Sequence, residues 1–491
     1  MLRRIFFMVV ASALLLTVAA CGGKSSSSVS VSAARSPGAD MVPASSAAFI
    51  SINTDPAGAQ WKKALELLAR VPAIGGQLGQ FLDQNVGAGV TLDELQQALG
   101  KTTDIVLLAS GSKQSAVLMS KPDDATKLKE ILGRNADKIA VREIDGWVVS
   151  SDSEAALDRF ESAHKEGKLS DSSKYADALA DLPENALATV FVDGSKLTDV
   201  ASSMSASNSS GFSLPSGLGT GQMNPVEWMG LAVRARDDGL HLNGIVKGTK
   251  GVGSFSPLLL AAVPADAAFA LDLKGSALGL EKIVNDLRND ATYGKQITAL
   301  ETMLQIKLED LARLAGSEMA AYGNGSAFTL LVGAPDAAKS VAMIDKLISL
   351  VGGQLSGLSA PSQATIDGVD AKKLTLGSMT VYYGVKDGRL FVTTGASGLT
   401  GAGKLSESAS YLAATKAIAM PAENAGVVFV DFARLNELLT SQSALLGQLG
   451  QLGGQSTTTP GSVDLTGLST LAAYIAANGD KVKITGLLAV K

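Results

Sequence analysis

The chain has 491 residues and a mass of 50.1 kDa, which is too large for one ordinary core and favours two or more domains. Hydrophobic residues make up 46% and charged residues 18%, so sizeable cores can form. The net charge is −5 and there is no basic tract, so a nucleic-acid partner is not expected.

Residues 1–20 have the composition of an export signal. Arg3 and Arg4 give a positive start, and the apolar stretch 5–20 has 16 residues, which is short for a membrane span. Two small residues precede Cys21, the only cysteine in the chain. The stretch "VAAC" (18–21) resembles the lipobox of bacterial lipoproteins. The alternative is an ordinary signal peptide before a chance cysteine, but an unpaired exported thiol is a liability that lipidation removes.

The resemblance implies that Cys21 is alkylated with diacylglycerol, that a dedicated peptidase cuts before it, and that the new amino terminus is acylated too. Two or three acyl chains anchor a protein stably, at about 0.8 kcal/mol per buried CH₂. Cys21 is therefore expected to be a lipidation site that holds the protein to the membrane, with palmitate-type chains. In a host with two membranes, Gly22 in place of aspartate after the cysteine implies the outer membrane, facing the periplasm.

Residues 21–41 follow as the lipidated cysteine and a Ser/Gly-rich segment without hydrophobic periodicity. This composition predicts a flexible tether with a root-mean-square span on the order of 25 Å. Such a tether lets a folded body stand off the bilayer.

The remaining sequence repeats itself. Six segments recur in the same order, which predicts a tandem duplication of a unit of roughly 210 to 230 residues, with a first repeat at 42–248, a join near 248–262 and a second repeat at 262–491. The matched segments are 42–53 with 263–274, 92–100 with 308–316, 121–132 with 334–348, 145–151 with 387–394, 169–175 with 405–411 and 183–193 with 421–431.

Within a unit, short apolar strands alternate with helices. Residues 47–53, 104–110 and 115–120 have strand patterns, and residues 61–71 and 123–134 have helical spacing. Asp-Gly pairs at 145–146 and 387–388 predict hairpin turns, and each unit closes with a hairpin, at 228–248 and 471–490. We therefore predict an α+β fold: two tandem copies of a mixed, mainly antiparallel sheet with helices packed on it.

The openings of these units carry a wider resemblance. "VPADAAFALDL" (263–273) and "LEDLARLAGSE" (308–318) resemble segments of uncharacterised bacterial exported proteins grouped as a domain of unknown function. The resemblance covers most of residues 42–491. It implies a duplicated extracytoplasmic α+β protein and no known activity.

The chain has only two histidines, which are the usual proton carriers at neutral pH. His164 is expected at the end of a helix, and His241, which alternates with leucines, is expected to face solvent on a strand. There is no HExxH, CxxC or EF-hand spacing and no GxSxG elbow. We therefore predict no catalytic residue, no metal and no cofactor.

One glycine-rich segment, "GLTGAGKLS" (398–406), comes close to the phosphate-loop pattern GxxxxGK[ST]. Gly398, Gly403 and Lys404 fit the pattern, but Leu405 occupies the place of the magnesium-binding hydroxyl. The segment is therefore interpreted as a glycine-rich turn rather than a nucleotide site.

Paired acids and large aromatic residues are assigned structural roles. Asp123–Asp124 and Asp237–Asp238 are expected at a helix start and a hairpin turn. The tryptophans have no counterparts in the second repeat, whereas one pair of tyrosines matches, so packing roles are expected for Trp61, Trp147, Trp228, Tyr175 and Tyr411.

Two kinds of low-complexity segment remain. Residues 74–90, 348–360 and 444–455 share Gly, Gln and Leu at helical spacing, which fits either packed helices or a groove for a lipid, an acyl chain or a membrane-protein segment. Residues 205–225 and 453–467 are rich in Ser and Gly and are expected to be long loops.

The leading hypothesis is a non-catalytic, lipid-anchored cell-envelope protein, acting as a periplasm-facing binding or scaffolding module. Its partners would be the membrane, through the acyl chains on Cys21, and an envelope protein. The alternative is a carrier or chaperone for a hydrophobic ligand at the membrane. A third class, a hydrolase without Cys or His chemistry, would have to use carboxylates, Lys, Ser or Tyr alone.

Overall fold

The chain is described here from a computed structural model. The structure describes residues 36–71, 92–108, 115–134, 139–196, 226–248, 253–274, 288–290, 293–304, 306–325, 327–352, 359–377, 379–401, 403–441 and 465–491. The predicted signal peptide, Cys21, the loops 205–225 and most of 453–467, and the segments 74–90 and 444–455 lie outside these residues, as does part of 348–360.

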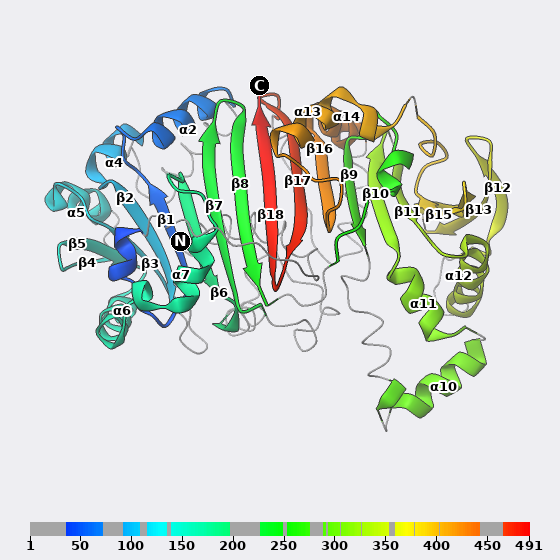
Figure 1. The fold of residues 1–491 in the computed structure, drawn as a ribbon, viewed down its shortest axis with the longest axis horizontal. Helices are drawn as coiled ribbons and strands as arrows, with labels where there is room; N and C mark the ends of the chain where they lie inside the picture. Colours follow the sequence, from blue (N-terminus) through cyan, green and yellow to red (C-terminus); the bar gives the residue numbers. More distant parts are fainter. Residues whose placement is uncertain are drawn as a thin grey trace.

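The described strands form one open sheet that extends across the whole molecule (Figure 1). Their spatial order is β4-β5-β3-β2-β1-β6-β7-β8-β18-β17-β16-β9-β10-β11-β15-β14-β13-β12, and every neighbouring pair is antiparallel. The bounds are β1 (Ser46–Asn53), β2 (Thr102–Leu108), β3 (Ser115–Ser120), β4 (Ala140–Ile144), β5 (Trp147–Ser151), β6 (Ala188–Asp193), β7 (Trp228–Arg236), β8 (Gly239–Lys247), β9 (Phe269–Lys274), β10 (Glu318–Asn324), β11 (Ala327–Val332), β12 (Ser362–Ile366), β13 (Val369–Leu376), β14 (Met379–Lys386), β15 (Arg389–Thr393), β16 (Gly426–Asp431), β17 (Leu468–Asn478) and β18 (Lys481–Val490).

Helices and short 3₁₀ turns connect the strands. They are η1 (Pro37–Asp40), α2 (Ala59–Ala69), α4 (Leu92–Ala98), α5 (Ala125–Gly133), α6 (Glu154–Glu166), η2 (Leu169–Asp171), α7 (Ser173–Ala180), η3 (Leu259–Ala262), α10 (Tyr293–Leu304), α11 (Leu308–Ala315), α12 (Ala337–Gly352), η5 (Leu405–Glu407), α13 (Ala409–Ala417) and α14 (Phe432–Ser441). Together with the antiparallel sheet, they confirm the predicted α+β class.

The two faces of the sheet bury different cores. On one face, α6 and α7 cover residues of the first half such as Phe49, and α13 covers residues of the second half such as Phe429. The opposite face carries a third apolar cluster, which includes Ile50, Val246 and Ile484 and therefore runs across both halves. Alternation of side chains along each strand explains why Phe49 and Ile50 belong to different cores.

The two halves meet where β8 pairs with β18, from Lys247 opposite Lys481 to Gly239 opposite Ala489. Outward from this seam the first half runs β8-β7-β6-β1-β2-β3-β5-β4, and the second runs β18-β17-β16-β9-β10-β11-β15-β14 before the added β13–β12 hairpin. The matched order is what a tandem duplication would produce. The duplication itself stays a prediction.

Acidic residues in and directly after helix α7, which belongs to the first half, form ion pairs with β18 of the second half. Asp177 accepts from Lys481 Nζ at 2.8 Å and from Lys247 Nζ at 3.3 Å, and Asp181 accepts from Lys481 at 3.2 Å. The Lys481 ammonium also lies 5.2 Å from the ring centre of the buried Trp228. A helix of the first half thus binds the edge strand of the second.

Local sequence signals have the expected structural effects. The turns at Asp145–Gly146 and Asp387–Gly388 have positive φ at both positions, as tight hairpins require. Asp124 caps α5 by accepting the N–H groups of Thr126 and Lys127. These features were predicted from the sequence.

The prediction for His241 is wrong. Its side chain is only 7% exposed, and its Nε2 atom lies 2.8 Å from Asp238 Oδ1. The alternating pattern of β8 suggested a half-exposed strand. His241 lies opposite Leu487 of β18, so its side chain is on the same face of the sheet as this buried leucine and is covered there rather than exposed.

None of the described helices is long and apolar enough to cross a membrane.

Candidate functional site

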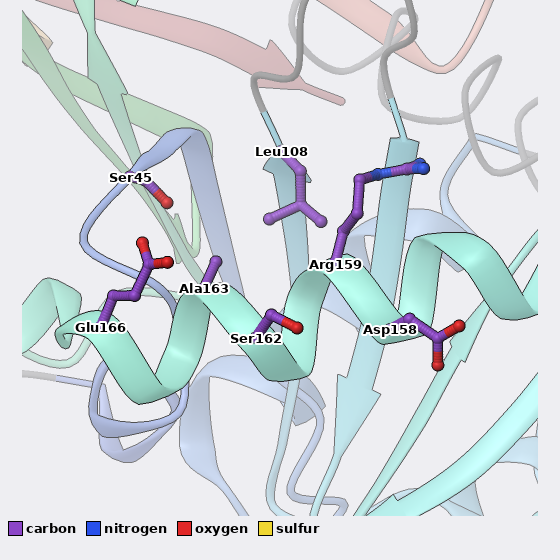
Figure 2. A pocket seen from close by; sticks show the side chains of 7 residues that line it. All are labelled: Ser45, Leu108, Asp158, Arg159, Ser162, Ala163 and Glu166. Carbon is purple, nitrogen blue, oxygen red and sulfur yellow. The ribbon is translucent and has the colours of Figure 1, made fainter.

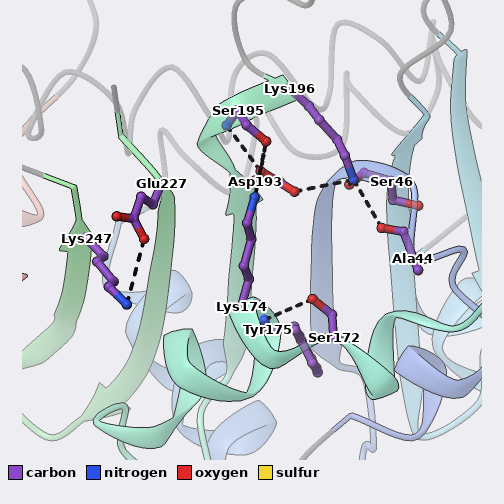
Figure 3. A network of polar contacts seen from close by, with 10 residues as sticks. All are labelled: Ala44, Ser46, Ser172, Lys174, Tyr175, Asp193, Ser195, Lys196, Glu227 and Lys247. Atoms are coloured by element: carbon purple, nitrogen blue, oxygen red, sulfur yellow. Dashed lines mark hydrogen bonds and ion pairs between the residues drawn. The ribbon is translucent and has the colours of Figure 1, made fainter. Parts of the chain in front are cut away.

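The loop before β1 lies between a polar cluster and a cavity. On one side, the Nζ atom of Lys196 donates to the carbonyl oxygens of Ala44, at 3.1 Å, and Ser46, at 3.3 Å (Figure 3). On the other side, Ser45 lines a cavity beneath α6 (Figure 2). Both features involve the same three residues, 44–46.

Asp193 is the centre of the polar cluster. It ends β6, its side chain is 9% exposed, and it pairs with Lys174 at 2.9 Å and Lys196 at 3.3 Å. Ser195 Oγ donates to its Oδ1 at 2.6 Å. Burial acts to raise the pKa of Asp193, but the hydrogen bonds from Ser195 and Lys174 and the charge of Lys196 outweigh it, so the pKa is lowered.

The cluster contains a serine–lysine contact, which invites a catalytic interpretation. Lys174 Nζ lies 3.2 Å from Ser195 Oγ. A lysine base needs a free nitrogen lone pair to take a proton, but Lys174 Nζ is engaged in an ion pair with Asp193. Ser195 already donates its proton to the same carboxylate. The geometry therefore supports a structural clasp over a nucleophile.

A similar clasp occurs in the second half. Asp431 ends β16, and Arg434, three residues later, donates from Nη1 to the carbonyl oxygen of Ala265. Arg434 Nε lies 3.9 Å from Asp431 Oδ2. In both halves, an aspartate at a strand end is followed three residues later by a cation, Lys196 or Arg434. This cation donates to backbone carbonyl oxygens just before or at the start of the first strand of its half.

The cavity beneath α6 has a volume of about 330 Å³, which is at the lower end of small-molecule sites. Helix α6 buries Ala156, Leu157 and Phe160 in the core, so its other side faces the cavity. The lining residues are Ser45, Leu108, Asp158, Arg159, Ser162, Ala163 and Glu166.

The charges in this cavity are unevenly compensated. Arg142 of β4 pairs with Asp158 at 3.0 Å. Arg159 donates from Nη2 to Ser115 Oγ, while its Nε is buried without a hydrogen-bond partner in the structure. Glu166 is exposed and has no ion pair among the described residues. The cavity therefore offers one cation and one anion that no neighbouring described side chain neutralises.

Two buried acids lie elsewhere in the sheet. Asp104 in β2 is fully buried next to Gly38 and Ser36, and burial raises its pKa to about 7 against weak opposition from the hydroxyls of Ser51 and Ser36. Asp272 in β9 is also fully buried, and burial, followed by the charge of Glu318, raises its pKa to about 8. Among the described residues, no group of three or more His, Cys, Asp or Glu side chains could hold a metal ion.

The glycine-rich segment 398–406 binds an anion of its own chain. The Oδ2 atom of Asp367, in the β12–β13 turn, accepts the backbone N–H groups of Gly398, Leu399 and Thr400 at 3.0 to 3.1 Å. Lys404 pairs instead with Glu407. The segment is a glycine-rich turn, as interpreted from its sequence. Its backbone N–H groups, which a phosphate would need as donors, already donate to the Asp367 carboxylate.

The other singled-out residues have structural contacts. His164 lies in the last turn of α6, as expected. Tyr175 and Tyr411 are both buried, each follows a serine cap, and each packs edge-on against a phenylalanine with ring centres 5.4 Å apart. Trp147 and Trp228 are buried, while Trp61 is partly exposed.

The clasp, the cavity and the buried acids were not predicted from the sequence. A signal existed for the clasp, because "VFVDGSK" (190–196) and "VFVDFAR" (428–434) place a cation three residues after a shared aspartate. A signal existed for Asp272, which interrupts an apolar strand, and for Asp104, which directly precedes the apolar run of its strand. None existed for the cavity, whose lining comes from three distant segments.

The fold and the site describe an α+β protein with an open antiparallel sheet and no recognisable catalytic centre among its described residues. A family model described as "Protein of unknown function (DUF3352)" matches residues 108–469, well over half of the chain. The chain belongs to this family.

Comparisons with other proteins add little. No curated protein matches. Among solved structures, crystal forms III and I of TP0453 are each similar with a TM-score of 0.25 and 9% identity, over 44% of this chain and 80% of that one. Crystal form IV has the same score and identity over 42% and 79%. Scores this low support no argument about function.

Proposed function

We propose that the protein is a non-catalytic, lipid-anchored cell-envelope protein that acts as a periplasm-facing binding or scaffolding module. In this proposal the acyl chains on Cys21 bind the membrane, the predicted tether ends where η1 begins at Pro37, and the folded body contacts an envelope protein. In a host with two membranes the anchor lies in the outer membrane.

The observation that carries the proposal is which charged side chains are ion-paired and which are not. Among the described residues, Asp193 forms ion pairs with Lys174 and Lys196. Asp177 likewise forms ion pairs with Lys247 and Lys481. A catalytic group needs a free proton acceptor or an activated nucleophile, and these clusters offer neither. The α6 cavity, in contrast, keeps uncompensated charges at its surface, as binding sites do.

The single sheet also suits a scaffold. Its two halves share a continuous ladder at β8–β18, and α7 adds ion pairs across it. A body of this kind resists bending at the seam. The prediction of a flexible tether is wrong for its last residues, because η1 (Pro37–Asp40) packs into the first half, where Ala39 is fully buried. A pull on the tether would therefore act on the core of the first half.

The alternative, a carrier of hydrophobic ligands, has one supporting observation. The apolar cluster on the sheet face opposite α7 and α13 crosses the seam and includes residues of both halves, such as Met229 and Ile475. These side chains are buried, so a lipid could reach them only if the face opened. Organic extraction of the purified protein followed by mass spectrometry would detect a retained lipid.

Proximity labelling in intact cells tests the leading proposal. A labelling enzyme fused to the carboxyl terminus of the anchored protein should enrich a small, reproducible set of envelope proteins. A Cys21→Ser variant, which lacks the anchor in this account, serves as the matched control and should lose that enrichment. Labelling that is the same for both variants would contradict an anchored binding module.

A further inference from the structure

Arg159 and Glu166 stand at opposite ends of the α6 cavity, and neither has a counter-ion among the described residues. Figure 2 shows the Glu166 carboxylate beside Ser45 and the Arg159 guanidinium at the far end, beyond Leu108. A partly buried guanidinium without an acceptor for its Nε is costly unless a ligand supplies one.

The neighbouring acids do not neutralise Arg159. Asp158 is next to it in sequence but is bound by Arg142, which also pairs with Glu154 and Glu161. Ser115 supplies a single hydroxyl oxygen to the five-donor guanidinium. The remaining donors of Arg159 are therefore available to an anion that enters the cavity.

The spacing of the two charges limits what can bind both. Seven residues of α6 separate Arg159 from Glu166, so their backbone positions are about 10 Å apart along the helix axis. An extended peptide of about three residues spans roughly the same distance between its amino and carboxyl termini. Between the charges, Leu108 and Ala163 offer an apolar floor, and Ser45 and Ser162 offer hydroxyls.

We propose that this cavity binds a short zwitterionic peptide of about three residues. Its terminal carboxylate pairs with Arg159, its terminal ammonium pairs with Glu166, and a central side chain packs over Leu108. The inference rests on the proposed binding function and deepens it by naming the class of ligand.

Isothermal titration calorimetry on the full-length protein in detergent micelles tests the inference, with the tripeptide Gly-Leu-Gly as the probe. The free peptide should bind, and blocking either its amino terminus by acetylation or its carboxyl terminus by amidation should weaken binding about tenfold. Glu166→Gln should weaken binding of the free peptide about tenfold but leave the acetylated peptide unaffected. Arg159→Gln should do the same for the amidated peptide.

Glu154→Gln is the matched control, because it removes the same charge from the same helix outside the cavity and should leave binding unchanged. Melting temperatures and circular dichroism of the three variants check that the fold persists. The inference is overturned if Gly-Leu-Gly gives no binding at millimolar concentration, or if both blocked peptides bind as tightly as the free one. It is also overturned if acetate alone binds as tightly, since the site would then recognise only an anion.

The two proposals fail separately. Absence of peptide binding, with specific proximity labelling retained, would remove the ligand and leave the binding module. Peptide binding without specific labelling would retain the cavity's ligand and contradict an envelope-protein partner.

Discussion

Asp104 should make the protein less stable as the pH rises from 4 to 7. The carboxyl is fully buried, and burial raises its pKa to about 7, whereas an unfolded aspartate has a pKa near 3.9. The folded state therefore keeps a proton that the unfolded state loses in this range. Because the folded state binds more protons, the free energy of unfolding must fall with rising pH.

The magnitude follows from the two pKa values. Each unit of difference corresponds to about 1.4 kcal/mol, so a difference of about 3 units contributes roughly 4 kcal/mol. This contribution to stability is fully present below pH 4, declines between pH 4 and 7, and is gone above pH 7. Replacement of Asp104 by asparagine keeps a neutral side chain of similar shape and should remove this contribution, while that of Asp272 remains.

Urea unfolding followed by tryptophan fluorescence measures the effect. At pH 5 the Asp104→Asn variant should differ modestly from the wild type, and by pH 8 its relative stability should have increased by about 3 kcal/mol. Asp480→Asn, at an exposed hairpin turn, is the control and should follow the wild type at both values. Parallel pH profiles for wild type and Asp104→Asn would refute the assignment of a neutral buried carboxyl.

Three further predictions concern the seam, the glycine-rich turn and the duplication. Lys481→Met removes the nearest cation from Asp177 and Asp181 and should lower the free energy of unfolding by about 1–2 kcal/mol. Lys483→Met, at an exposed position of the same strand, is the control and should not lower it. Equal urea midpoints for the two variants would refute a stabilising role for the ion pairs between α7 and β18. Asp367→Ala leaves three backbone N–H groups without an acceptor and should speed their amide hydrogen exchange, with unchanged protection as the contrary result. Superposition of 42–248 on 262–491 in an experimental structure should give one topology twice, and a different strand order in the two would sink the duplication.

Sequence patterns predicted the elements and their local pairing well. Asp145–Gly146 and Asp387–Gly388 act over two residues, so their turns could be read directly. The serine caps before Tyr175 and Tyr411 are equally local. Local chemistry of this kind determines hairpins and helix ends without knowledge of the rest of the fold.

The long-range arrangement could not be predicted in the same way. The alternation of β8 does not reveal that the face carrying His241 is shared with the buried Leu487 of β18, which is why His241 was placed in solvent. Likewise, nothing in the sequence near Gly398 reveals that Asp367, some thirty residues earlier, would accept the hydrogen bond from its backbone N–H. In the sequence, Arg159 is indistinguishable from an ordinary helical arginine. Only the fold shows that Arg142 forms an ion pair with the neighbouring Asp158.

The central claim, an anchor at Cys21, is most directly tested by mass spectrometry of the amino-terminal peptide from protein extracted from membranes. The account predicts a mature chain that begins at Cys21 and carries a diacylglyceryl group on sulfur, and a Cys21→Ser variant that is neither acylated nor cut at this position. A mature chain that begins at another residue, or an unmodified Cys21 thiol, would contradict it.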